Sequence, residues 1–350
     1  VLNQPPKIAQ DEPLLDPKYV MRESGEQISA VLEEDLEARP DFVRIAGRWF
    51  ARALLLDVNI GHLNLAEAVL DMAGGGPMAT SELVEEIELA SDVNPKLVEF
   101  SLDLAMQEDP RFDEVGPAGQ VLWHLQRLEP PEVLETPLYL RYSEIDYDRS
   151  LLSEEMLALE RELDDELSQI ENPFPKTDEV VIRLIYPHWR SGTLPLSASV
   201  EHLFPTAYEA PRIRFMLVDE ETGESFPGWV VRSKRYVFGL REWYDRLNLM
   251  PGSLIRVRAG DNPGEVVIGT DDRRSTREWV RTVLVGSDGG IVFAMLKQIV
   301  NAEYDERMAI AIPDIEAIDQ VWSQIQRNRP PFERVVVNTC LLYTSPSPRD

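Results

Sequence analysis

The chain contains very little cysteine and histidine. Among its 350 residues there is one cysteine, Cys340, and there are four histidines. A single thiol cannot form an internal disulfide, and the chain before Cys340 offers no thiolate for catalysis or for zinc. None of the histidines has another at metal-ligand spacing: His62, His124, His188 and His202. The sequence therefore predicts no metal site and no cofactor.

Long apolar runs and net positive charge are also missing. The longest uninterrupted apolar runs, such as 291–296, have about six residues, whereas a membrane-spanning helix needs about 20. Lysine and arginine total 35 against 62 aspartates and glutamates, a net charge of −27. This balance argues against a general affinity for phosphate backbones, because counterion release needs basic side chains. We expect a cytoplasmic protein with no membrane contact.

The sequence lacks the common signatures of catalysis. The glycines at 74–76 are followed by proline and not by the Gly-Lys-Ser/Thr ending of a phosphate-binding loop. No Gly-x-Ser-x-Gly motif is present. A nuclease would use a Glu-x-Lys pair on a strand, but the two lysines after residue 181, Lys234 and Lys297, have no glutamate two residues before them. We expect no enzymatic activity and assign no catalytic residue in this fragment.

Helix signals are dense between residues 63 and 128. After an apolar segment at 41–56 that is also read as helical, one helix covers 63–73, a second starts at Thr80 or Ser81, and a third runs from Asn94-Pro95 to about 107. A hairpin over 111–125 follows. The predicted solvent stripe of the third helix is Lys96, Glu99, Asp103 and Gln107.

Three helices followed by a hairpin is the winged-helix order. Residues 63–128 hold 13 acids and three bases, and this acidic segment resembles the winged helices attached to bacterial RNA polymerase, such as its delta subunit. Two carboxylates in the middle of the third helix would repel DNA phosphates. The resemblance implies a protein-contact module, with RNA polymerase or another protein as its partner, in preference to direct DNA contact.

A linker and an acidic amphipathic helix are expected next. Residues 129–148 are rich in proline and acids. Between 152 and 171 apolar residues recur every three or four positions: Leu152, Met156, Leu159, Leu163, Leu167 and Ile170. This spacing predicts a helix with an acidic outer face, which either packs on a neighbouring domain or pairs with a partner helix.

Short strands separated by turns dominate from residue 177. The order from Thr193 to Ile268 resembles the DNA-binding pseudobarrel of plant auxin-response-type transcription factors and some restriction enzymes. The resemblance uses a small helix at 197–203, a paired Trp229, a helix with Trp243 and a Leu-x-x-Gly turn at 249–252. Ser253 stands where that family has aspartate. The resemblance implies a small β-barrel that binds nucleic acid.

Basic residues concentrate in this region. Residues 181–285 hold 15 bases and 13 acids, so the rest of the chain carries −29. The predicted nucleic-acid-binding residues are Arg212, Arg214, Arg232, Lys234, Arg235, Arg256, Arg258, Arg273, Arg274 and Arg277. Five of them, at 232, 234, 235, 256 and 258, are expected to line one electropositive surface. The competing interpretation pairs these side chains with local acids such as Asp271 and Asp272.

The last segment is expected to open a further α+β unit. Strands are predicted at 280–285 and 291–294 around a glycine turn, while the 274/277/281 spacing of arginines would also fit one face of a helix. The chain starts at Val1 and not at a methionine, and its ending CLLYTSPSPRD resembles a translated sequencing adapter. Both ends of the chain are therefore expected to be cut.

The predicted fold class is α+β, in six segments. They are an acidic lead-in (1–40), a helical winged-helix domain (41–128), the linker with its amphipathic helix (129–176), a small β-barrel domain (177–270), a truncated α+β segment (271–338) and an artefact tail (339–350). We expect a non-enzymatic protein that contacts nucleic acid through 177–285 and a protein partner through 63–128. The alternatives are a protein-interaction scaffold, and the recognition part of a restriction-type nuclease.

Overall fold

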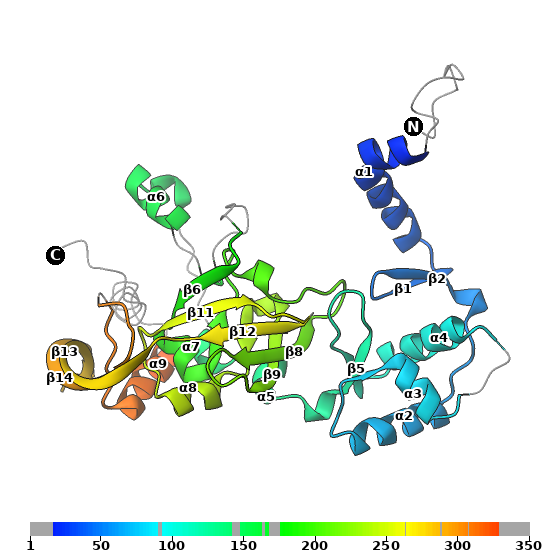
Figure 1. Cartoon of the computed structure of the whole chain (residues 1–350). Helices are drawn as coiled ribbons and strands as arrows, with labels where there is room; N and C mark the ends of the chain where they lie inside the picture. The colour runs from blue at the N-terminus through cyan, green and yellow to red at the C-terminus, as the bar shows by residue number, and fades with distance from the viewer. Residues whose placement is uncertain are drawn as a thin grey trace.

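The computed structural model describes residues 17–89, 93–141, 148–162, 165–167, 176–262, 264–287, 289–306 and 308–328. The CLLYTSPSPRD tail lies outside these residues. The α+β class is confirmed: helices and a small sheet form the N-terminal part, a curled seven-stranded sheet forms the centre, and a long two-stranded ribbon extends beyond it (Figure 1).

The N-terminal part begins with a helix and a hairpin. Helix α1 (Pro17–Glu37) is followed by β1 (Phe42–Ile45) and β2 (Arg48–Ala51), which pair antiparallel. The prediction of a helix over 41–56 is therefore wrong. Ala46 and Gly47 both have positive φ, of 47° and 72°, which is the backbone of a two-residue hairpin turn.

The predicted helices and hairpin of the next segment are present. The elements are α2 (Ile60–Met72), β3 (Met78–Ala79), α3 (Thr80–Glu86), α4 (Pro95–Gln107), β4 (Phe112–Glu114) and β5 (Leu122–Leu125). The strands form a sheet in the order β3-β5-β4. Asn94 caps α4 as predicted, because its side chain accepts a hydrogen bond from the Lys96 amide at 2.9 Å.

Helix α4 departs from its predicted solvent stripe. Asp103 is buried and its carboxylate accepts hydrogen bonds from the Thr80 hydroxyl and, at 3.0 Å, from Nε1 of Trp123. The prediction that Asp103 faces solvent is therefore wrong. Thr80 is also not the cap of α3, because residue 79 takes that position without a side-chain hydrogen bond. On its other side α4 packs Phe100 against Phe50 of the hairpin.

The described residues of the connection between the two main parts form short helices and turns. It contains α5 (Pro131–Leu134), the short 3-10 turns η4 (Leu138–Leu140) and η5 (Arg149–Leu151), and α6 (Glu154–Glu162). Val133 and Leu140 are buried, so the predicted linker at 129–148 is in part a packed interface. The amphipathic helix is shorter than predicted within the described residues, and part of its predicted range lies outside them.

The central part is a seven-stranded sheet that curls around an apolar core. Its strands are β6 (Glu179–Arg183), β7 (Thr193–Pro195), β8 (Arg212–Asp219), β9 (Ser225–Val231), β10 (Tyr236–Phe238), β11 (Leu254–Ala259) and β12 (Glu265–Gly269). The strand order is β6-β11-β12-β8-β9-β10-β7, and only β12 and β8 pair in parallel. We call this part the half-barrel.

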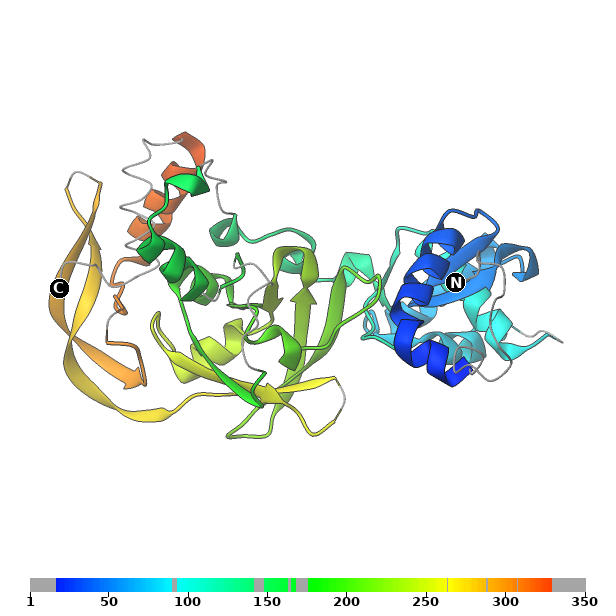
Figure 2. The same ribbon diagram turned by 90° about the horizontal axis from the view of Figure 1, so that it is seen from above.

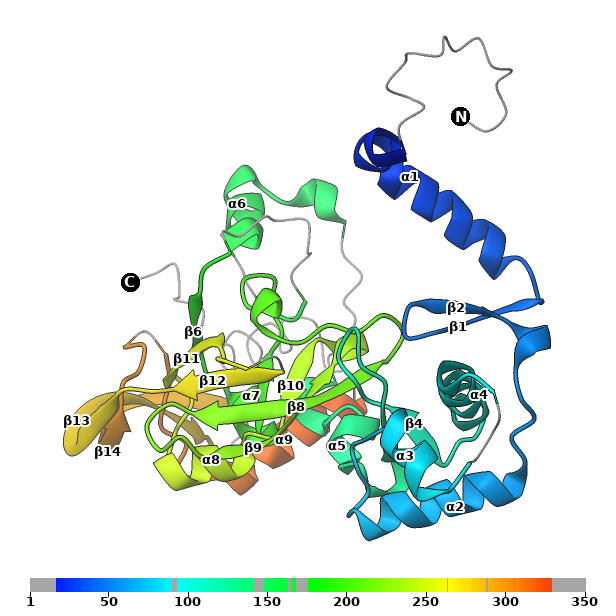
Figure 3. The same cartoon turned by 45° about the vertical axis from the view of Figure 1, so that its right-hand side comes forward.

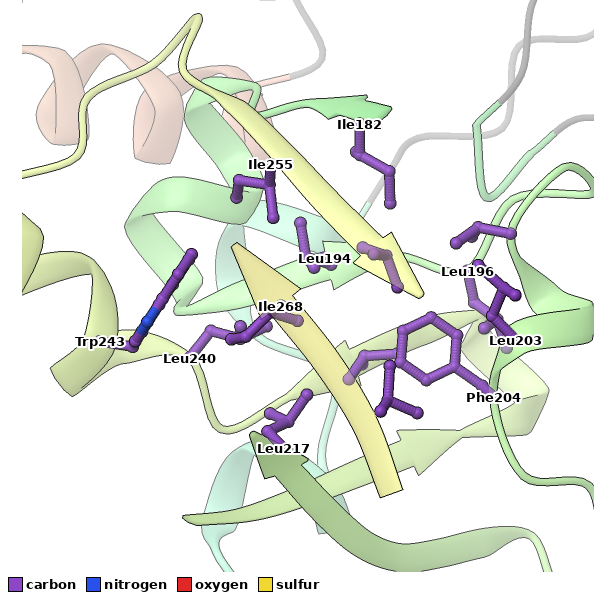
Figure 4. Packing of buried hydrophobic residues seen from close by; sticks show 14 of the residues in the cluster. Ile182, Leu194, Leu196, Leu203, Phe204, Leu217, Leu240, Trp243, Ile255 and Ile268 are labelled. Atoms are coloured by element: carbon purple, nitrogen blue, oxygen red, sulfur yellow. The ribbon is translucent and has the colours of Figure 1, made fainter. Parts of the chain in front are cut away.

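The core of the half-barrel is formed by inward-facing strand residues and by the helices that close the sheet. Strand β8 alternates half-buried and buried positions, and its inner residues meet Ile182, Ile255 and Ile268 from neighbouring strands (Figure 4). The sheet is closed by α7 (Tyr186–Ser191), η6 (Glu201–Leu203) and α8 (Arg241–Leu247), the last of which buries Trp243. Trp243 is thus part of the core.

A long antiparallel ribbon follows the half-barrel. Strands β13 (Asp272–Val285) and β14 (Ile291–Ala302) pair over most of their length, and α9 (Ile315–Asn328) packs beside them (Figure 2). The two predicted strands exist but are longer than predicted, and the helical interpretation of the 274/277/281 spacing is wrong. Among the described residues, no helix is both long and apolar enough to cross a membrane.

Candidate interaction surface

The predicted cations of strand β11 are engaged by carboxylates. Arg256 donates to Glu220 at 2.9 Å and also pairs with Asp271, and Nε of Arg258 lies 3.6 Å from Glu220. The hydrogen bonds that Arg256 donates to these two carboxylates raise its pKa above its usual value. Two of the predicted phosphate-binding side chains are therefore neutralised within the half-barrel.

Arg212 and Arg214 on β8 face the N-terminal part of the chain. Nε of Arg212 donates to Asp113 of β4 at 2.8 Å and lies 3.2 Å from Glu129. Arg214 is half-buried, and this burial lowers its pKa. Its amide donates to the carbonyl of Val115 at 2.9 Å. These arginines hold two parts of the protein together.

Apolar packing surrounds this contact. Trp229, Val231 and Tyr236 of the half-barrel form one buried cluster with Val115, Val133 and Leu140 from the N-terminal part and the connection. The Tyr236 hydroxyl donates to the carbonyl of Glu132 at 2.6 Å. The hairpin β4–β5 that would serve as a wing thus lies against the half-barrel, as the rotated view in Figure 3 shows.

The third group of predicted cations follows strand β9. Arg232 donates to the carbonyl of Ala210 at 2.9 Å, and Arg235 donates to the carbonyl of Glu166 at 3.0 Å. Lys234 is exposed. Strands β12 and β8 separate β11 from β9 in the sheet. Residues 232, 234 and 235 are therefore two strands away from 256 and 258, whose side chains already contact carboxylates. That these five residues line one electropositive surface stays a prediction.

The ribbon carries a different cationic surface. The pairs Arg277–Ile299, Trp279–Lys297 and Arg281–Met295 lie opposite one another in the β13–β14 register. Because side chains alternate along a strand and directly paired residues share a side, these six residues lie on one face of the ribbon. We call them the ribbon face. It combines three cations with three apolar side chains and contains no acid.

The apolar side chains of the ribbon face are exposed to solvent. Trp279, Met295 and Ile299 are 65%, 56% and 58% exposed. Arg277 and Lys297 are also exposed, and neither forms an ion pair with a described carboxylate. A solvent-exposed patch of large apolar side chains with charged residues around it is typical of an interaction site. The ribbon face is the strongest candidate of this kind among the described residues.

The opposite face fixes the ribbon to the rest of the protein. Val280, Thr282 and Val300 are buried against a cluster that includes Met308 and Ile310. The Ile310 amide donates to the carbonyl of Arg281 at 3.0 Å. The ribbon face therefore lies on an anchored element, which reduces the conformational entropy lost on binding.

The remaining two predicted cations lie next to the ribbon face. Arg273 lies 3.9 Å from Glu278 and 5.7 Å from the ring centre of Tyr304. Arg274 is exposed and has no ion pair among the described residues. Of the ten predicted residues, only Arg277 belongs to the ribbon face itself. Arg273 and Arg274 precede it on β13.

A hollow beside α8 is lined by Asp219, Glu220 and Glu221, and the carboxylates of the first two are engaged. Asp219 accepts from Nε1 of Trp243 at 2.9 Å and from Arg246 at 2.5 Å, and Glu220 accepts from Arg256. The backbone hydrogen bonds and the Trp243 and Arg246 contacts outweigh burial and lower the pKa of Asp219. Within the described parts of the chain, no group of three His, Cys, Asp or Glu side chains could hold a metal ion.

Sequence reasoning missed Trp279, Met295, Lys297 and Ile299 as a surface. The available signal was a period of two: W-x-R on β13 and M-x-K-x-I on β14 place alternating apolar and basic residues on one side. Recognising them as one face requires the register of the ribbon.

No family model, curated protein or solved structure matches the chain. The winged-helix and pseudobarrel resemblances therefore remain predictions.

Proposed function

We propose that this chain is a non-enzymatic interaction scaffold whose ribbon face binds a partner polypeptide that carries acidic and apolar side chains. The observation that carries the proposal is the exposed set Trp279, Met295 and Ile299 with three cations and no acid on the same face. Tryptophan, methionine and arginine are enriched in protein–protein interfaces. The cations select an acidic partner over a neutral one.

The N-terminal part fits this role as a second contact module. Its acidic helices leave Ile60, Leu65 and Met72 of α2 exposed, which suits a protein partner, such as the RNA polymerase expected from the resemblance, better than a polyanion. The engagement of Arg212, Arg256 and Arg258 by carboxylates weakens the competing proposal of phosphate contact through the half-barrel. A cytoplasmic location belongs to this proposal.

Nucleic acid remains the second candidate because of the ribbon's own charge. Residues 272–302 contain five bases and three acids, and a two-stranded β-ribbon fits the DNA major groove. Three exposed apolar side chains at the centre of the face favour the polypeptide, since phosphate contacts need polar donors.

Binding to three labelled probes tests the proposal. They are an acidic amphipathic peptide unrelated to this chain, a DNA duplex and a single-stranded oligonucleotide, each followed by fluorescence anisotropy at several salt concentrations. The ribbon variant is Trp279→Ser with Met295→Ser, and the matched control is Arg256→Gln with Arg258→Gln. We expect the peptide to bind the wild type and the control, and to bind the ribbon variant at least about tenfold more weakly, a loss of about 1.4 kcal/mol.

The opposite outcomes are equally clear. If the peptide does not bind the wild type, or binds the ribbon variant equally well, the scaffold proposal is wrong. If an oligonucleotide binds with a steep salt dependence and the ribbon variant weakens it, the surface is a nucleic-acid site.

A further inference from the structure

A second amphipathic surface of opposite charge lies in the same chain. Helix α6 contains four glutamates and one arginine over Glu154–Glu162, a net charge of −3. Its first turn is fixed by Ser153, whose hydroxyl accepts from the Met156 amide at 3.2 Å. The ribbon face carries three cations and no acid. The two surfaces are complementary in charge.

Helix α6 and the turn before it also carry apolar side chains that are exposed to solvent. Met156 is 57% exposed, and Leu151, just before the helix, is 81% exposed. None of the hydrophobic clusters formed by the described residues includes a residue of α6. Figures 1 and 3 show the helix standing clear of the sheets. An amphipathic helix gains stability when its apolar stripe is covered by a partner.

We propose that α6 of one copy docks on the ribbon face of a second copy. Met156 would cover the apolar centre around Trp279 and Met295, and Glu154 and Glu155 would lie among Arg277, Arg281 and Lys297. This is the helix-on-apolar-surface mode of recognition, with charge fixing the orientation. Two such contacts related by a two-fold axis make a closed dimer. The inference rests on the proposed function and names its partner.

The anchor that follows α6 favours docking between copies. Glu166 lies four residues after the helix, and its buried carboxylate lies 3.2 Å from Nε2 of the buried His188. Its carbonyl accepts from Arg235 at 3.0 Å. Four residues reach at most about 14 Å. Figures 1 and 3 both place α6 apart from the ribbon, so docking within one copy would have to break this anchor, whereas docking between copies would not.

Analytical ultracentrifugation of charge-reversed full-length chains tests the inference. The ribbon-reversed chain is Arg277→Glu with Lys297→Glu, and the helix-reversed chain is Glu154→Lys with Glu155→Lys. We expect the wild type to dimerise as its concentration rises and each reversed chain alone to dimerise at least about tenfold more weakly. An equimolar mixture of the two should recover a dimer, because opposite charges then meet again. All four positions are at the surface, so circular dichroism should show unchanged folding.

Three results would overturn the inference. They are a wild type that stays monomeric at every concentration, a dimer that neither reversal weakens, and a mixture that does not associate. If the wild type is monomeric while the unrelated acidic peptide still binds the ribbon face, the inference is wrong and the proposed function stands. If that peptide also fails to bind, both are wrong.

Discussion

Arg212 on β8 and Asp113 on β4 form an ion pair between the half-barrel and the N-terminal part, with 2.8 Å between Nε and Oδ2. Glu129 lies 3.2 Å from the same Nε, and its side chain is fully buried. The Arg212 guanidinium therefore contacts two carboxyl groups, at an interface that also buries Trp229 and Tyr236. Arg212, which the sequence predicted to bind nucleic-acid phosphate, instead joins two parts of the chain.

Removal of Arg212 should destabilise the protein. Arg212→Met leaves the half-buried Asp113 and the buried Glu129 without a cation, which we expect to cost about 3–5 kcal/mol of unfolding free energy. Chemical denaturation followed by fluorescence measures this cost. The triple variant with Asp113→Asn and Glu129→Gln should recover most of the loss. An Arg212→Met chain as stable as the wild type would show that the ion pair does not hold the interface.

Stability should depend on the protonation of Glu129. Burial, reinforced by the neighbouring Asp113, raises the pKa of Glu129 to about 8, against the opposing effect of Arg212. Its folded pKa lies above its unfolded value, so the folded state binds more protons and this contribution to stability falls as pH rises from about 4.5 to about 8. Thermal melts of wild type and Glu129→Gln should therefore diverge, with the variant gaining relative to the wild type at high pH. A difference that does not change with pH contradicts the assignment.

Asp103 and Gln107 should respond differently to the same substitution, although the sequence placed both on one solvent stripe. Asp103 is buried and bonded to Trp123 and Thr80, whereas Gln107 is exposed. Asp103→Ala leaves the buried Thr80 hydroxyl without its acceptor and removes one of the two acceptors of Trp123 Nε1, and we expect a loss of about 1–3 kcal/mol. Gln107→Ala should change stability by less than about 0.5 kcal/mol. Equal effects in urea denaturation would restore the solvent-stripe interpretation.

Substitutions on the buried side of the ribbon should lower stability, whereas substitutions on its exposed side should weaken binding. Val300→Ala opens a gap in the buried cluster with Val280 and Met308, at a cost of about 1–3 kcal/mol. Met295→Ala on the exposed side should cost less than about 0.5 kcal/mol and should weaken binding of the acidic peptide. A large loss of melting temperature in Met295→Ala would mean that this face is structural.

Local signals predicted much of the fold. The Asn94-Pro95 pair fixed the start of α4, because a capping side chain and a proline at the first helical position act within one turn. The hairpin at 42–51 was missed because its aromatic and apolar residues also fit a helix. Only the positive φ of Ala46 and Gly47 decides between the two, and alanine gives no sign of it in a sequence.

The candidate surface was harder to predict because it depends on pairing across the chain. Arg212 meets Asp113 across 99 residues, and Trp279 meets Lys297 only through the register of the ribbon. Charge counts identified the basic region correctly, but they cannot tell a cation that faces solvent from one that faces a carboxylate. The spacing of Arg274, Arg277 and Arg281 fitted a helix and was resolved by strand pairing.

The 19F NMR signal of Trp279 tests the ribbon face most directly. The chain has seven tryptophans, and 5-fluorotryptophan labelling with a Trp279→Phe variant assigns this one. On addition of the acidic amphipathic peptide we expect the Trp279 line to shift while the lines of the buried Trp229 and Trp243 stay in place. A Trp279 line that does not move when the peptide is bound would contradict the account.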